Sequence, residues 1–173
     1  MKIKIVRECS DFLKSSSGNP LVRMLPKDGP AMRTVKIRQK KTATRFDEAF
    51  NTVFSDHPNV RQRCVFTNGV HTHSNDPTLD EFYIFPKDGF RFMYSTSVVD
   101  SSQQYGNVFD NLNEAMAPGN AIETISQILE FDYRSDNLLT GILTGCEIII
   151  FGCPSYYAIN RDSVKSYSTL FSL

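Results

Sequence analysis

The chain has 173 residues and a mass of 19.6 kDa, with 40% apolar residues, 12% aromatic residues and no tryptophan. This length suits one well-filled core, and the apolar content excludes an intrinsically disordered chain. Lysine plus arginine and aspartate plus glutamate number 19 each, so no global field favours nucleic acid or an anionic membrane. Residues 33–45 are the local exception, because they carry six basic side chains and no acid.

The N-terminus and the cysteines predict a cytoplasmic protein. Residues 1–8 contain no long apolar core and no small-residue cleavage site, so we expect no secretory signal peptide. The apolar runs fall well short of a membrane span, and we expect no membrane partner. The four cysteines are scattered without a Cys-x-x-Cys pair, which favours free, mostly buried thiols in a reducing compartment.

The first half of the chain predicts short strands around one helix. Residues 2–13 are interpreted as a short strand that runs into a turn of helix. Alternating or β-branched segments predict three strands, at 21–25, 32–38 and 63–69. Phenylalanines at helical spacing, with Asp47 and Glu48 near the start, predict a helix over 46–55.

The second half alternates between strands and helices. Two aromatic strands, 81–86 and 90–97, are joined by Lys-Asp-Gly and predict a hairpin. Residues 101–105 are interpreted as a loop. Three helices are predicted at 108–117, 121–131 and 136–143, the last capped by Ser135 and stopped by Gly145. Strands at 147–151 and 155–159 complete the pattern. Together these elements predict an α+β fold in a single domain, residues 1–173, with short, mostly antiparallel strands and several flanking helices.

Glu147 opens the apolar strand Glu-Ile-Ile-Ile-Phe, which ends before Pro154. A carboxylate at the mouth of a buried strand is costly unless it is paired, solvated or used, because desolvation penalises its ionised form. Two interpretations stay open from this stretch alone: an exposed residue at the strand start, or a functional carboxylate.

Other kinds of site have weaker support. His71 and His73 have a spacing that suits a metal, but they lie in a polar segment where no cysteine or carboxylate pattern completes the site, so we expect no metal. Glycine-rich loops that cradle phosphates are absent from the sequence. The basic stretch 33–45 is either a solvated loop or a contact for nucleotide phosphates or a nucleic acid.

The order of several short motifs resembles the mono-ADP-ribosyltransferases, and in particular phage-encoded proteins of that type. Arg23 lies in a strand that resembles the family's first arginine-bearing strand, and the helix over 46–55 follows. Residues 63–69 are similar in position to the family's Phe-x-Ser-Thr-Ser strand. Residues 146–151 resemble its glutamate-bearing strand, which an aromatic strand with Tyr156 and Tyr157 follows.

The resemblance implies a core split into two sheets and a reaction on NAD. Arg23 would hold the dinucleotide, together with the middle motif Phe66, Thr67 and Asn68. The tripeptide Ser-Thr-Ser itself also occurs in the sequence, starting at Ser95. Ser95 is therefore the alternative to Thr67 as the residue whose hydroxyl supports the site. Glu147 would be the catalytic residue of a reaction that transfers ADP-ribose to a host protein or nucleic acid. The reaction would take place in the host cytoplasm and would need no metal.

The residue types suit this chemistry. An arginine can fork onto phosphate oxygens with fixed geometry. Departure of nicotinamide develops positive charge on the ribose, as in glycoside hydrolysis, and an ionised carboxylate stabilises that charge in the transition state.

One departure from the family pattern keeps other functions open. Many relatives that modify proteins carry Glu or Gln two residues before the catalytic glutamate, whereas this chain has Gly145. The alternatives are a catalytically inactive ADP-ribosyltransferase-like binding or virion-associated protein, and a small inhibitor that binds a host protein through the predicted hairpin 81–97.

Overall fold

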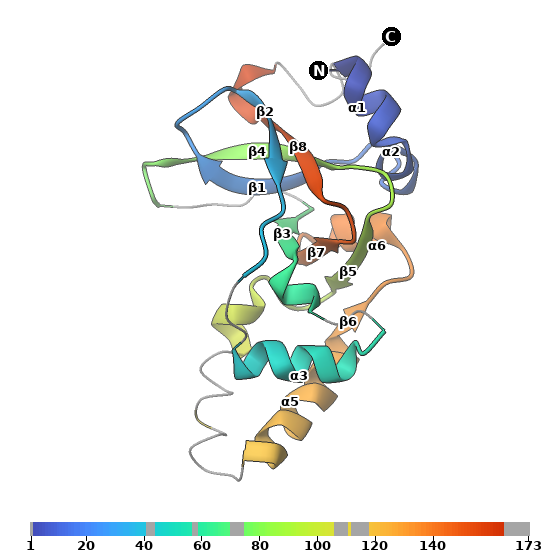
Figure 1. Cartoon of the computed structure of the whole chain (residues 1–173), viewed down its shortest axis with the longest axis vertical. Coiled ribbons are helices and arrows are strands. Elements are labelled where there is room, and N and C mark those ends of the chain that lie inside the picture. The colour runs from blue at the N-terminus through green and yellow to red at the C-terminus, as the bar shows by residue number, and fades with distance from the viewer. Residues whose placement is uncertain are drawn as a thin grey trace.

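The structure, a computed structural model, describes residues 2–40, 44–56, 59–69, 75–105, 111 and 118–164. Its centre is one antiparallel sheet of eight strands in the order β2-β8-β4-β1-β3-β7-β5-β6 (Figure 1). The strands are β1 (Leu21–Pro26), β2 (Met32–Lys36), β3 (Cys64–Asn68), β4 (Leu79–Pro86), β5 (Arg91–Ser95), β6 (Tyr133–Arg134), β7 (Glu147–Phe151) and β8 (Ser155–Asn160). The α+β class and the antiparallel pairing are therefore as predicted.

Helices cover the sheet at both ends of the molecule. They are α1 (Lys2–Glu8), α2 (Ser10–Ser15), α3 (Arg45–Val53), α5 (Pro118–Asp132) and α6 (Leu138–Thr144), with 3₁₀ turns at Val60–Gln62 and Arg161–Ser163. Figure 1 shows α1 and α2 beside β8 at the top, and α3 crossing above α5 at the bottom. Among the described residues, none of the helices combines the length and the apolar character that crossing a membrane requires.

The sheet has a narrow waist between β1 and β3. Strand β1 pairs with β4 along its whole length, from Leu21 to Pro26, whereas in the described residues it meets β3 only at Val22 and Asn68. One core cluster surrounds β1, β4 and β8 and reaches α6, and a second lies between β7 and the helices α3 and α5. The described strands thus form a single continuous sheet; the first core cluster extends across its waist to β7, and the second lies wholly on the β3–β6 side of it.

Strand β7 is the most deeply buried of β3, β5, β6 and β7, the strands on the α3 and α5 side of the waist. Ile148 and Ile150 face the first core cluster and Ile149 faces the second, as the alternation of a strand requires. Both faces are covered, which is why the sequence here is a continuous apolar run rather than an alternating one. The helix stop at Gly145 is confirmed, because this residue has a positive φ of 71°.

The strand predicted at the start of residues 2–13 is wrong, because this segment forms α1, and the predicted turn of helix that follows it is α2. Ile5, Cys9 and Phe12 are all buried, and their spacing of four and three residues belongs to a helix. Ile3 is 83% exposed and therefore faces away from the core. The local alternation of lysine and isoleucine at the start resembles a strand, but the longer helical period decides the structure.

The predicted hairpin over 81–97 is also wrong. Both strands exist, but β4 pairs with β1 and β8, whereas β5 pairs with β7 and β6. The link between them crosses the waist, and its Asp88 accepts hydrogen bonds from the Asp11 N–H at 2.9 Å and the Ser10 hydroxyl at 3.2 Å. The turn residues therefore hold α2 in place, and no hairpin is present for a host partner to bind.

Helix N-caps explain two further differences between the predicted and the observed elements. Residues 101–105 are helical instead of a loop, because Asp100 accepts from the backbone N–H groups of Ser102 and Gln103 at the start of the segment. Helix α6 is capped by Asn137 rather than Ser135. The predicted helix at 121–131 is confirmed by α5, and the one predicted at 108–117 lies almost entirely outside the described residues.

We predict that Gly69→Ala strongly destabilises the fold. A Cβ at position 69 would lie 1.9 Å from the backbone oxygen of Ile142 and 2.3 Å from its Cα, so α6 would have to move away from the sheet. We expect a loss of about 1–3 kcal/mol in the free energy of unfolding, measured by urea denaturation. Gly119→Ala is the control, since open space surrounds that position, and it should be neutral or slightly stabilising. Equal stability of the two variants would contradict this account of the α6 contact.

Candidate functional site

A cationic cavity of about 520 Å³ opens on the face of the sheet formed by β1, β2 and β8. We call it the Arg23 cleft. Its charged lining residues are four cations and one acid: Arg23, Arg33, Lys36, Arg38 and Asp28. Leu25, Val65 and Tyr156 contribute to its apolar wall. The volume is in the range of small-molecule sites, and the excess of positive charge favours an anionic ligand.

Among the described residues, the guanidinium of Arg23 has no counter-ion. Its Nη1 donates to the backbone oxygen of Phe66 at 2.5 Å, which fixes the group beside β3. Its Nε is buried and has no hydrogen-bond partner. Within the described ranges no carboxylate pairs with Arg23. A buried donor without an acceptor is costly, so a ligand that supplies negative oxygens near this guanidinium would be stabilised.

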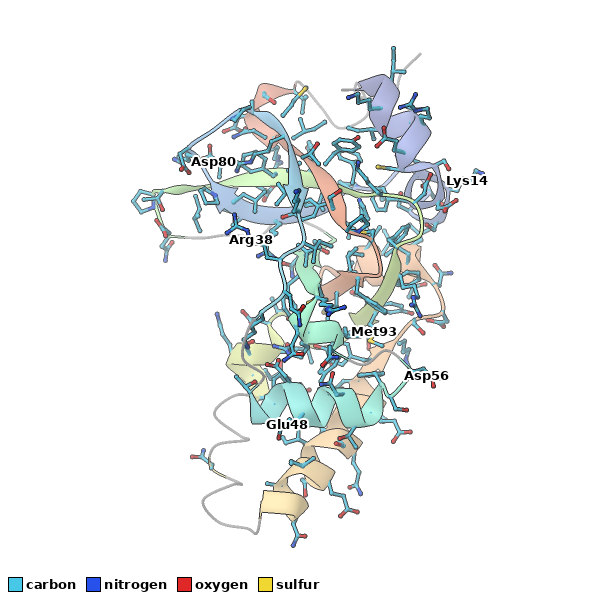
Figure 2. All side chains as sticks on the ribbon, in the orientation of Figure 1. Lys14, Arg38, Glu48, Asp56, Asp80 and Met93 are labelled. Carbon is cyan, nitrogen blue, oxygen red and sulfur yellow. The ribbon has the colours of Figure 1, made fainter. Side chains whose placement is uncertain are left out.

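The other cations of the cleft are likewise not neutralised in the described part of the chain. Arg33 donates to the backbone oxygens of Asp28 and Pro26, each at 2.6 Å, and its guanidinium lies 4.5 Å from the centre of the Phe82 ring. These contacts orient Arg33 without cancelling its charge. Figure 2 shows Arg38 below β1, on the segment that descends from β2 towards α3.

Glu147 lies elsewhere, in a sealed site between β7 and the helices of the second core. Its side chain is buried, and 5% of the residue is exposed. Oε1 accepts from the Tyr133 hydroxyl at 2.6 Å, and Oε2 accepts from the backbone N–H and the hydroxyl of Ser101, each at 3.1 Å. Burial raises the pKa of Glu147, and these donors oppose the rise without abolishing it. Burial also raises the pKa of Tyr133, so this hydroxyl stays a donor.

Arg61 connects Glu147 to α3. Its Nε donates to Asp47 at 3.1 Å, and its Nη1 donates at 2.7 Å to the same Ser101 hydroxyl that bonds Glu147. Its guanidinium carbon lies 4.6–5.3 Å from the ring centres of Phe46, Phe50 and Phe66. We call Asp47, Arg61, Ser101, Tyr133 and Glu147 the Arg61 network.

Asp47 is the second carboxylate of the Arg61 network. Burial acts to raise its pKa, but hydrogen bonds from Thr44 and Lys40 outweigh burial and hold the pKa below its ordinary value. The same carboxylate closes a capping box with Thr44 at the start of α3. With both carboxylates satisfied, the network joins α3, the helical segment 101–105, β6 and β7.

Three of the predicted site residues lie on neighbouring strands but not in one cleft. Arg23, Thr67 and Glu147 belong to β1, β3 and β7, which are adjacent in the sheet. Thr67 pairs with Ile148 and Asn68 pairs with Glu147, so Thr67 and Glu147 point to opposite faces. The Thr67 hydroxyl is already bonded to the Ile148 oxygen at 3.0 Å.

The remaining predicted residues have different surroundings. Ser95 lies on the strand next to β7, and its hydroxyl accepts from the N–H groups of Ser97 and Val98 in the following turn. Asn68 donates to the Val99 oxygen at 3.5 Å. Phe66 touches both sites, because its ring lies by Arg61 and its carbonyl accepts from Arg23.

Sequence reasoning missed most of the Arg61 network. Arg61, Ser101 and Tyr133 are far apart along the chain and belong to no motif. The one available signal was Thr44 followed three residues later by Asp47, which is the spacing of a capping box. The basic stretch 33–45 did mark three cations of the Arg23 cleft, and its contact with phosphates was one of the two interpretations offered.

No family model, no curated protein and no solved structure matches this chain. Function is therefore inferred from the geometry of the two sites. In the described residues, no group of three or more His, Cys, Asp or Glu side chains is placed to hold a metal ion. His71 and His73 lie outside the described residues.

We predict that Arg61→Met lowers the free energy of unfolding by about 3–5 kcal/mol, because removing one partner of a buried ion pair leaves Asp47 with only the half-exposed Lys40 as a cationic partner among the described residues and takes a donor from Ser101. Met keeps most of the side-chain volume among the three phenylalanine rings. Arg63→Met is the matched control, since Arg63 is exposed and donates to Gln39 at the surface. Urea denaturation measures both variants, and similar losses for the two would show that the network does not stabilise the fold.

Proposed function

We propose that this protein binds a phosphate-bearing nucleotide in the Arg23 cleft, and that NAD is the first ligand to test. The observation that carries the proposal is the Arg23 guanidinium, which is held by the Phe66 carbonyl and has a buried Nε without a partner. A diphosphate supplies charged acceptor oxygens for such a group, and its bonds to arginine are stronger than those of a neutral ligand.

The choice of NAD rests on the resemblance to the mono-ADP-ribosyltransferases. In that comparison Arg23 holds the dinucleotide, and its place in the cleft agrees with such a role. The narrow waist between β1 and β3 would correspond to the division of a two-sheet core, as the resemblance implies. The leading proposal is therefore an ADP-ribosyltransferase-like binding protein that does not transfer ADP-ribose.

Binding without transfer is favoured over catalysis because of the state of Glu147. Both carboxylate oxygens already accept hydrogen bonds, and the residue is buried away from the Arg23 cleft. A carboxylate that stabilises a ribose cation must reach the sugar, and this one would first have to leave Tyr133 and Ser101.

An active NAD-dependent ADP-ribosyltransferase is the second candidate. The observation in its favour is that Arg23, Thr67 and Glu147 lie on three successive strands of the sheet, with Ser95 on the strand beyond. In this candidate, movement of the segment that carries Ser101 would release Glu147, and a host protein or nucleic acid would accept the ADP-ribose.

Isothermal titration calorimetry with NAD tests the leading proposal. We expect saturable binding by the wild type and a loss of about tenfold or more in Arg23→Ala, because a charge-assisted hydrogen bond contributes about 1.5–3 kcal/mol. Arg134→Ala is the control, since it removes an exposed arginine on β6 and should bind like the wild type. Absence of NAD binding by the folded wild type would contradict the proposal.

Nicotinamide release from the same samples separates the two candidates. The binding protein should release none above background, both as wild type and as Glu147→Gln. Release by the wild type that disappears in Glu147→Gln would instead establish the transferase.

A further inference from the structure

Tyr156 is the aromatic residue in the wall of the Arg23 cleft. It lies on β8, where it pairs with Val35 on one side and Pro86 on the other. Its ring belongs to the first core cluster, and 4% of the residue is exposed. The ring is therefore too deeply buried to stack on a nucleotide base.

The Tyr156 hydroxyl has no hydrogen-bond partner within the described residues. Two buried side-chain atoms lack a partner there, Ser16 Oγ and Arg23 Nε, and the Tyr156 oxygen is not one of them. The oxygen therefore lacks a partner without being sealed from solvent, and Tyr156 lines the cavity together with Arg23 and Arg33. Buried tyrosines usually bond their hydroxyl, so an open one is a feature to explain.

Burial keeps the Tyr156 hydroxyl protonated, although two cations are near it. Burial raises the pKa of Tyr156, while the positive charges of Arg23 and Arg33 oppose the rise. The hydroxyl is therefore protonated at neutral pH and lies in the field of both guanidinium groups. An anion drawn to either arginine would find a neutral donor beside it.

We propose that the Tyr156 hydroxyl donates a hydrogen bond to a phosphoryl oxygen of the ligand in the Arg23 cleft, which makes Tyr156 a residue that selects phosphoryl groups. This inference rests on the proposed nucleotide binding and specifies the part of the ligand that is recognised. A phosphoryl group presents several oxygens in different directions, so it can accept from an arginine and a tyrosine at once. A carboxylate has two oxygens in one plane and is less able to satisfy both.

The neighbouring Tyr157 provides a matched comparison. It points to the opposite face of β8, where its hydroxyl donates to Glu8 at 2.6 Å and so fastens α1 to the sheet. The two tyrosines thus differ by one position in the chain: one hydroxyl is used in the folded protein and the other is open.

The test compares Tyr156→Phe with Tyr157→Phe in titrations with pyrophosphate. We expect Tyr156→Phe to weaken binding by about tenfold or more, in the range of a hydrogen bond to a charged group, without lowering the melting temperature. Tyr157→Phe should bind like the wild type but melt at a lower temperature, because Glu8 loses one of its donors and α1 loses this bond to β8. Succinate serves as the carboxylate probe and should bind more weakly than pyrophosphate.

The outcomes separate the two proposals. Equal pyrophosphate affinity in the wild type and Tyr156→Phe would overturn the role of Tyr156 and leave nucleotide binding intact. Succinate binding as tight as pyrophosphate binding would overturn the selection of phosphoryl groups. A folded wild type that binds neither NAD nor pyrophosphate would overturn the proposed function, and the role of Tyr156 with it.

Discussion

The buried guanidinium of Arg61 holds together the half of the molecule that contains β7, α3 and α5. It bonds Asp47 on α3 and the Ser101 hydroxyl, and Ser101 in turn bonds Glu147 at the start of β7. Three phenylalanine rings surround the charge and exclude water from it. Charges taken out of water must be compensated locally, so each member of the network constrains the positions of the others. This requirement explains why a carboxylate is tolerated at the head of a fully buried strand.

Arg23 presents the opposite situation on the other side of β3. Both arginines contact Phe66, Arg61 through its ring and Arg23 through its carbonyl oxygen. Arg61 has a carboxylate partner, whereas Arg23 has carbonyl support and an unpaired Nε. The protein thus uses one arginine to complete its own structure and leaves the other with unused binding capacity. That difference is why the cleft of Arg23, and not the site of Glu147, is proposed to bind the ligand.

Local signals in the sequence predicted most of the strands and the helix at 121–131, because apolar periodicity and capping residues act over a few positions. Pairing partners were not predictable in the same way. Lys87-Asp-Gly has the composition of a hairpin turn, yet its Asp88 caps α2 and its strands belong to different parts of the sheet. The site shows the same limit. Arg23 and the basic stretch were visible as isolated features, but the partners of Glu147 come from residues 101 and 133, which only the folded chain brings together.

The central claim is that Arg23, unlike Arg61, has room for an anionic partner. The most direct measurement follows the Nε–H resonances of both arginines in two-dimensional ¹H–¹⁵N NMR spectra during a titration with NAD. Arg61 is the internal reference, because its Nε–H is already bonded to Asp47. The account predicts a saturable shift of the Arg23 resonance while that of Arg61 stays in place. An unchanged Arg23 resonance at saturating NAD, or a shift confined to Arg61, would contradict it.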